Sequence, residues 1–61
     1  MKRRDLVRHL KKQGCRQSRE GGRHTVFTNP TTGRSSSIPR HRELNEFLVK
    51  KICKDLDVPA P

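Results

Sequence analysis

Apolar residues recur at helical spacing near both ends of the chain. Leu6, Val7 and Leu10 form a narrow apolar stripe, which predicts a helix over residues 2–13. Gly14 follows directly, and glycine readily takes the left-handed conformation that ends many helices. Towards the other end, apolar residues at i, i+3, i+4, i+8 and i+12 predict a second helix, from 43 to about 56. The core positions predicted for this second helix are Leu44, Phe47, Leu48, Ile52 and Leu56.

Three short segments between these helices are strand candidates. Residues 23–28 give the strongest signal, because their last four residues read Thr-Val-Phe-Thr, all of them β-forming types. Strict alternation puts Val26 on one face together with His24, and Phe27 on the other face. We therefore expect either Val26 or Phe27 to pack under a helix and the other to be partly exposed. The weaker and more polar strand candidates are residues 15–19 and 34–38.

Glycine and proline mark the turns between the strands. Residues 20–22 (Glu-Gly-Gly) predict a hairpin turn, in which glycine supplies a positive φ without steric cost. Residues 29–33 (Asn-Pro-Thr-Thr-Gly) predict the next turn. The resulting order α-β-β-β-α predicts an α+β fold, in which both helices cover one face of a three-stranded antiparallel sheet. The other face stays open, as in small double-stranded-RNA-binding domains.

The size of the chain limits its core. No internal repeat or linker is visible, so we expect a single domain over residues 1–61. Only 28% of the residues are hydrophobic, and a core this small rarely supplies more than about 3–5 kcal/mol of stability. A partner that binds only the folded form would add stability by mass action.

The net charge of +9 is unevenly distributed. Residues 1–42 carry 12 Lys and Arg against Asp5 and Glu20, whereas residues 43–61 carry three Lys against four acids. A basic surface of this density attracts polyanions, of which nucleic acid is the usual one. A merely solvated basic surface is the alternative. A membrane is not an expected partner, because the basic residues lack a large apolar face and no apolar run approaches about 20 residues.

The two cysteines point to a structural role. Cys15 and Cys53 have no CxxC spacing and no secretory leader is visible, so we expect a reduced, cytoplasmic setting. Both are expected to be small buried residues rather than nucleophiles or ligands. His9, on the first predicted helix, is expected to be solvated.

Few kinds of catalysis suit these residues. No nucleophile–base motif is present, and we expect neither a metal site nor a cofactor, because the histidines are scattered and the acids cluster near the C-terminal end. RNA cleavage without a metal needs only a base for the ribose 2′-hydroxyl and cations for the phosphate. His24 is the candidate base, since histidine titrates near neutral pH. Arg19 and Arg23 are candidate phosphate ligands. A solvated or structural His24 is the alternative.

Several segments together resemble the HicA family, toxins of bacterial HicA–HicB toxin–antitoxin pairs. The resemblance covers nearly the whole chain, and the order and spacing of its parts carry it. These parts are Asp5-Leu6, the helix ending at Gly14, the Arg-x-Gly-Gly-x-His segment from Arg19 to His24, Asn29-Pro30-Thr31-Thr32-Gly33, Ile38-Pro39-Arg40-His41 and the closing amphipathic helix.

The resemblance implies a double-stranded-RNA-binding-like fold and an endoribonuclease that inactivates mRNA. The family's functional histidine is the fourth residue of a Gly-Ser-x-His motif, which reads Gly-Gly-Arg-His here, so the catalytic role falls on His24. This chain differs from the family pattern at three positions. Gly22 replaces the family serine, Arg23 replaces a histidine that is common in the family, and Cys15 replaces an aromatic residue that is common there. The residues expected to bind RNA are Lys2, Arg3, Arg4, Arg19, Arg23, Arg40 and His41.

The expected partners are mRNA and a cognate HicB-like antitoxin that covers the active site. We expect the toxin itself to be monomeric and to enter a larger complex through the antitoxin. The alternative function is a non-catalytic RNA-binding module of the same fold. A third is a chain that exists mainly as half of a protein complex. The RNA sequence preference stays open, as does the group that protonates the leaving 5′-oxygen; His41 is a candidate, or else a phosphate contact.

Overall fold

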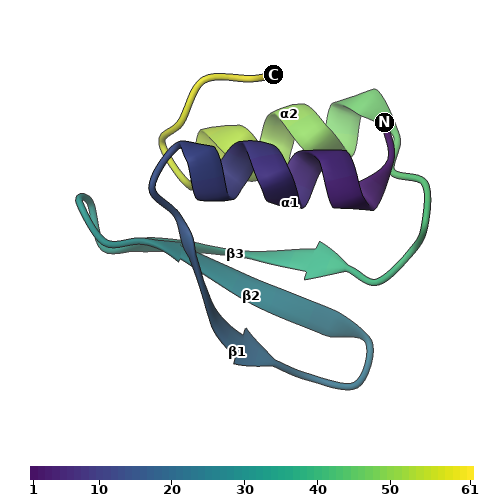
Figure 1. Cartoon of the computed structure of the whole chain (residues 1–61), viewed down its shortest axis with the longest axis horizontal. Helices are drawn as coiled ribbons and strands as arrows, with labels where there is room; N and C mark the ends of the chain where they lie inside the picture. Colours follow the sequence, from purple (N-terminus) through teal and green to yellow (C-terminus); the bar gives the residue numbers. More distant parts are fainter.

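The computed structural model describes residues 1–61 and has an α+β fold of the double-stranded-RNA-binding type. Its elements, in chain order, are α1 (Arg3–Lys12), β1 (Arg16–Glu20), β2 (His24–Asn29), β3 (Arg34–Pro39) and α2 (Glu46–Asp55). The strands form one antiparallel sheet in the order β1-β2-β3. The two helices lie side by side on one face of this sheet and start at the same end of the molecule (Figure 1). The predicted element order and layout are confirmed.

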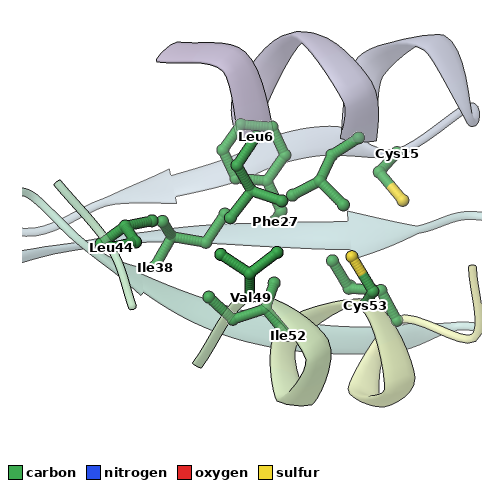
Figure 2. Packing of buried hydrophobic residues seen from close by; sticks show 10 residues of the cluster. Leu6, Cys15, Phe27, Ile38, Leu44, Val49, Ile52 and Cys53 are labelled. Carbon is green, nitrogen blue, oxygen red and sulfur yellow. The ribbon is translucent and has the colours of Figure 1, made fainter. Parts of the chain in front are cut away.

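The core lies between the helices and the sheet. Phe27 of β2 and Ile38 of β3 are fully buried, and side chains from both helices pack over them (Figure 2). Val26 is half-buried on the open face, so of the two neighbours it is Phe27 that packs under the helices. Cys15 and Cys53 are buried and free, as expected.

The prediction for the second helix was wrong in two respects: it placed the start of the helix too early, and it assigned some buried positions incorrectly. α2 begins at Glu46, because the side chain of Asn45 accepts a hydrogen bond of 2.9 Å from the amide of Leu48 and caps the helix. Leu44 is buried from the loop before this cap, and Phe47 is 86% exposed. The stripe that faces the sheet is Val49, Ile52, Cys53 and Leu56.

The first helix ends as its glycine predicts. Gly14 has φ +92°, and the amides of Gly14 and Cys15 bond to the carbonyls of Lys11 and Leu10 at 3.0 and 2.9 Å. This pattern satisfies carbonyls that the helix itself leaves free. Cys15 thereby enters the core one residue before β1, rather than being the first residue of a strand.

Two other expectations were wrong. Gly21 and Gly22 turn the chain without a positive φ, which among the glycines is found at Gly14 and Gly33. His9 is not merely solvated: the residue is half-buried, and its Nε2 lies 2.7 Å from the carbonyl oxygen of Pro59. A carbonyl only accepts, so this nitrogen carries the proton and His9 ties α1 to the segment after α2.

Candidate active site and nucleic-acid interface

His24 is the first residue of β2, and its side chain is exposed. The tight turn before it fixes its backbone, because the amide of Gly21 donates a hydrogen bond of 2.8 Å to the His24 carbonyl. A Cβ at position 21 would lie 3.3 Å from that carbonyl oxygen, whereas a Cβ at Gly22 would meet no atom within 4 Å. The close approach therefore favours glycine at 21 but leaves room for the family's serine at 22.

Strand pairing brings a second histidine to the same place. His24 lies opposite Pro39 of β3, and the amide of Arg40 donates to the carbonyl of Arg23 at 3.2 Å just beyond the end of β3. His41 follows directly. The residues that line the resulting hollow of about 610 Å³, here called the histidine hollow, are Gly22, Arg23, His24, Pro39, Arg40 and His41. It brings together two imidazoles and two guanidinium groups, with no carboxylate among the lining residues.

A second, entirely basic hollow adjoins the first. This basic hollow, of about 330 Å³, is lined by Lys2, Arg3, Arg4, Arg40 and Arg42. Arg40 borders both hollows, so the two adjoin. The basic hollow includes the first residues of α1, and both helices begin at this end of the molecule (Figure 1). Six of the seven residues expected to bind RNA border one or both hollows.

Arg19 is the expected RNA-binding residue that borders neither hollow. It lies in β1 opposite Val26, on the open face of the sheet and diagonal to His24. Its exposed side chain extends the positive surface along that face. The serines of β3 lie nearby, and one of them is engaged within the sheet, because the Thr28 hydroxyl lies 2.8 Å from the Ser18 hydroxyl and 2.9 Å from that of Ser35.

Arg3 differs from the other basic residues because its side chain donates hydrogen bonds to other residues of the fold. Its Nε donates to the Pro39 carbonyl at 3.1 Å, and its Nη2 donates to the Thr25 hydroxyl at 2.9 Å. Its backbone amide donates to the Arg42 carbonyl at 2.9 Å. Arg3 therefore holds the start of α1 against the sheet and against the loop that carries Arg40 and Arg42.

Arg42 is a residue of this surface that the expected RNA-binding set lacks. The sequence did contain a signal, since residues 40–42 read Arg-His-Arg. What sequence spacing could not reveal is that Arg42 lies beside the first residues of α1, because that proximity depends on an interaction between distant parts of the chain.

Glu20 forms an ion pair with one arginine of this surface. Its Oε1 lies 3.3 Å from the Arg40 Nη2, and both side chains are about half exposed. An exposed pair of this kind contributes about 0–1 kcal/mol. Such a weak pair leaves the Arg40 guanidinium able to exchange Glu20 for a phosphate.

Other kinds of site find little support among the side chains. No group of three or more His, Cys, Asp or Glu is arranged to hold a metal ion. Burial raises the pKa of the Cys15 and Cys53 thiols, and the neighbouring Cys15 raises that of Cys53 further, so neither is an activated nucleophile. No helix reaches the length and apolar character needed to cross a lipid bilayer.

The fold and the two hollows define a small double-stranded-RNA-binding-like domain with a basic end suited to a polyanion. The family model for the HicA toxin of bacterial toxin–antitoxin systems matches residues 3–58 of the 61 residues. The chain therefore belongs to the HicA toxin family, which confirms the resemblance found in the sequence, and it is a toxin with an antitoxin partner. Searches of curated proteins and of solved structures gave no match.

Proposed function

We propose that this toxin is a metal-independent endoribonuclease that cleaves mRNA with His24 as its general base. The HicA family consists in general of ribonuclease-type toxins, which supports the class of activity. The observation that carries the proposal is the histidine hollow, in which exposed His24 lies among Arg23, Arg40 and His41. These are the groups that cleavage by the ribose 2′-hydroxyl requires: a proton acceptor, a proton donor and cations for the phosphate.

The reaction starts at the ribose. Neutral His24 removes the proton of the 2′-hydroxyl, and the 2′-oxygen forms a bond to the adjacent phosphorus. The phosphate gains negative charge as this bond forms, and the guanidinium groups of Arg23 and Arg40 stabilise it through charge-assisted hydrogen bonds. The bond from phosphorus to the 5′-oxygen then breaks. The products are a 2′,3′-cyclic phosphate and a 5′-hydroxyl end.

The leaving 5′-oxygen needs a proton, and we assign its transfer to His41. This histidine lines the same hollow as His24 and is exposed, which supports a role for both imidazoles at one phosphate. In this scheme one imidazole starts neutral and accepts a proton, and the other starts protonated and donates one. Because this assignment gives each histidine a separate chemical step, the two can be tested separately.

The HicB-like antitoxin is proposed to cover the histidine hollow and to neutralise part of the +9 charge. The exposed basic end and the core of ten buried residues support this, since a partner that binds the folded form adds stability. The toxin alone is proposed to be monomeric and cytoplasmic, and to enter the larger complex through the antitoxin. The complex should melt at a higher temperature than the isolated toxin, and an equal melting temperature would contradict this docking.

The experiment that tests the activity is cleavage of a long single-stranded RNA in EDTA. The wild type should produce fragments that end in 2′,3′-cyclic phosphates, identified by mass spectrometry, and His24→Ala should produce none. His9→Gln is the matched control, because it removes a histidine outside the hollow and keeps a donor for Pro59. All three proteins are checked for folding by circular dichroism.

Each pattern of cleavage has a distinct meaning. Equal cleavage by the wild type and His24→Ala would assign the activity to another group or to a contaminant, and the role of His24 would be abandoned. If neither protein cleaves RNA and both bind it with equal affinity, the chain is the non-catalytic RNA-binding module that the same basic surface would also serve.

A further inference from the structure

The basic hollow is distinct from the histidine hollow and contains no residue that transfers a proton in the proposed chemistry. Its lining consists of five cationic side chains and no acid or apolar residue. Four of them, Lys2, Arg4, Arg40 and Arg42, are exposed. Like charges that line one hollow repel one another. The arrangement is therefore suited to an anion that would remove this repulsion.

Bonds within the fold hold these cations together. The Arg3 amide donates to the Arg42 carbonyl at 2.9 Å, and the Leu44 amide donates to the Met1 carbonyl at 2.8 Å. Lys2 pairs with Glu43 in an isolated β-bridge. These bonds join the first residues of α1 to the loop after β3, so the hollow is formed before any ligand binds. A preformed site loses less conformational entropy on binding than one that must be ordered.

The start of α1 adds to the attraction of this hollow for an anion. A helix has the positive end of its dipole at its first turn. α1 has ten residues, and Lys2, Arg3 and Arg4 lie at its start. The cationic side chains and the helix dipole therefore act in the same direction here.

The position of Arg40 relates the basic hollow to the histidine hollow. Arg40 lines both, so a chain with one phosphate beside His24 has a second cationic site directly next to the first. The repeating anion of single-stranded RNA is the ligand that can fill two adjoining sites at once. A single small anion would fill one of them.

We propose that the basic hollow binds a backbone phosphate of single-stranded RNA, next to the phosphodiester that is cleaved at His24. Arg42 and Arg4 are the exposed side chains that bind this phosphate. This inference rests on the proposed function, because it takes the histidine hollow as the place where RNA is cleaved. It makes the basic hollow a subsite that sets the minimum length of a tightly bound substrate.

The test measures the affinity for RNA that cannot be cleaved. Fully 2′-O-methylated oligonucleotides lack the attacking hydroxyl, so binding is measured whether or not His24 acts as a base. A dinucleotide with one phosphate is compared with a tetranucleotide with three, at several salt concentrations. The proteins are the wild type, Arg42→Ala, Arg4→Ala and Lys12→Ala. Lys12→Ala removes the same charge at the far end of α1, about 12 Å from Arg4.

The proposal predicts a gain in affinity with length that depends on the basic hollow. The wild type should bind the tetranucleotide at least about tenfold more tightly than the dinucleotide, and Arg42→Ala and Arg4→Ala should each lose most of this gain. Their salt dependence should fall by about 0.7 in log–log slope for each phosphate that the variant no longer binds. Lys12→Ala should keep the gain.

The opposite results are equally clear. An identical gain with length in all four proteins would overturn the subsite. A loss in Lys12→Ala as large as in Arg42→Ala would show a general effect of net charge, and would also overturn it. If the gain depends on Arg42 and Arg4 but the wild type cleaves no RNA, the catalytic proposal fails and the phosphate site stands as part of a binding module.

Discussion

The buried hydroxyl of Thr25 depends on an arginine from a helix. Thr25 is 1% exposed, and its hydroxyl accepts a hydrogen bond from Arg3 at 2.9 Å. Arg3→Ala should lower the free energy of unfolding by about 1–3 kcal/mol, because a buried polar group loses a charged partner. Urea denaturation measures this loss. Arg3→Lys should recover little of it, since one ammonium does not reproduce the fork that also binds the Pro39 carbonyl.

Arg4 provides the control for Arg3. It is the next residue and its side chain is exposed, so Arg4→Ala should change the free energy of unfolding by less than about 0.5 kcal/mol. Equal destabilisation by the two substitutions would mean that charge near α1, rather than the bonds of Arg3, determines the effect.

The roles proposed for the two histidines can be tested separately by changing the leaving group. In a substrate whose bridging 5′-oxygen is replaced by sulfur, the leaving thiolate needs no proton. His41→Ala should lose about 10²–10⁴-fold in rate on ordinary RNA, the usual contribution of a general acid, but little on the sulfur substrate. His24→Ala should lose activity on both, because the 2′-hydroxyl still has to be deprotonated. If His41→Ala lowers the cleavage rate equally on both substrates, His41 is not the general acid and only binds phosphate.

At the scale of the elements, one side chain decides where α2 begins. Asn45 accepts from the Leu48 amide at 2.9 Å, and the residues before it form the loop that carries Arg40 and Arg42. Asn45→Ala should cost about 1 kcal/mol of stability, whereas Asn45→Asp should keep most of it, because aspartate is an equally good helix cap. Hydrogen exchange at the Leu48 amide should become faster in Asn45→Ala and not in Asn45→Asp. Unchanged exchange in both would contradict the cap.

Strand β2 and the second helix show where local sequence patterns predict the structure correctly and where they fail. Alternation along β2 correctly separated Phe27 from Val26, because successive side chains of a strand point to opposite faces. The apolar spacing of the second helix was misleading, because Leu44 belongs to the loop and Phe47 to the exposed face. A periodic count cannot distinguish a loop residue that folds back into the core from a residue of the helix.

At the scale of the whole molecule, the two buried thiols make stability depend on pH. Burial raises the pKa of Cys15 and Cys53, so in the alkaline range the folded state binds more protons than the unfolded state. Their contribution is therefore complete below the ordinary thiol pKa of about 8.5. It is lost as the pH rises from there through the raised values.

Urea denaturation between pH 7 and pH 10 measures this dependence. The double variant Cys15→Ala with Cys53→Ala should show a smaller fall of stability across the range, although it is less stable throughout because two buried side chains are shortened. A fall as steep as that of the wild type would assign the alkaline loss to groups other than the thiols.

The charge of the whole molecule was predictable, but its arrangement was not. The excess of Lys and Arg in residues 1–42 follows from counting, and it indicated a polyanion as the partner. The division of these cations into two adjoining hollows depends on β3 ending beside β2 and on α1 starting beside the loop after β3. His24 was predicted as the candidate base from its motif, whereas Arg42 became a candidate phosphate ligand only from its neighbours in space.

The sequence by itself determined the order of the elements, the ends of α1 and the identity of the candidate base. Each of these depends on residues near one another in the chain: an apolar period, a glycine in a left-handed conformation, a short motif. The tertiary structure decided what depends on distant parts of the chain. It put Phe27 rather than Val26 under the helices, joined Arg3 to Thr25 and Pro39, and brought His41 and Arg40 to His24. Strand register and helix packing set this arrangement, because the pairing of distant segments is decided by the burial of the whole core and not by local sequence.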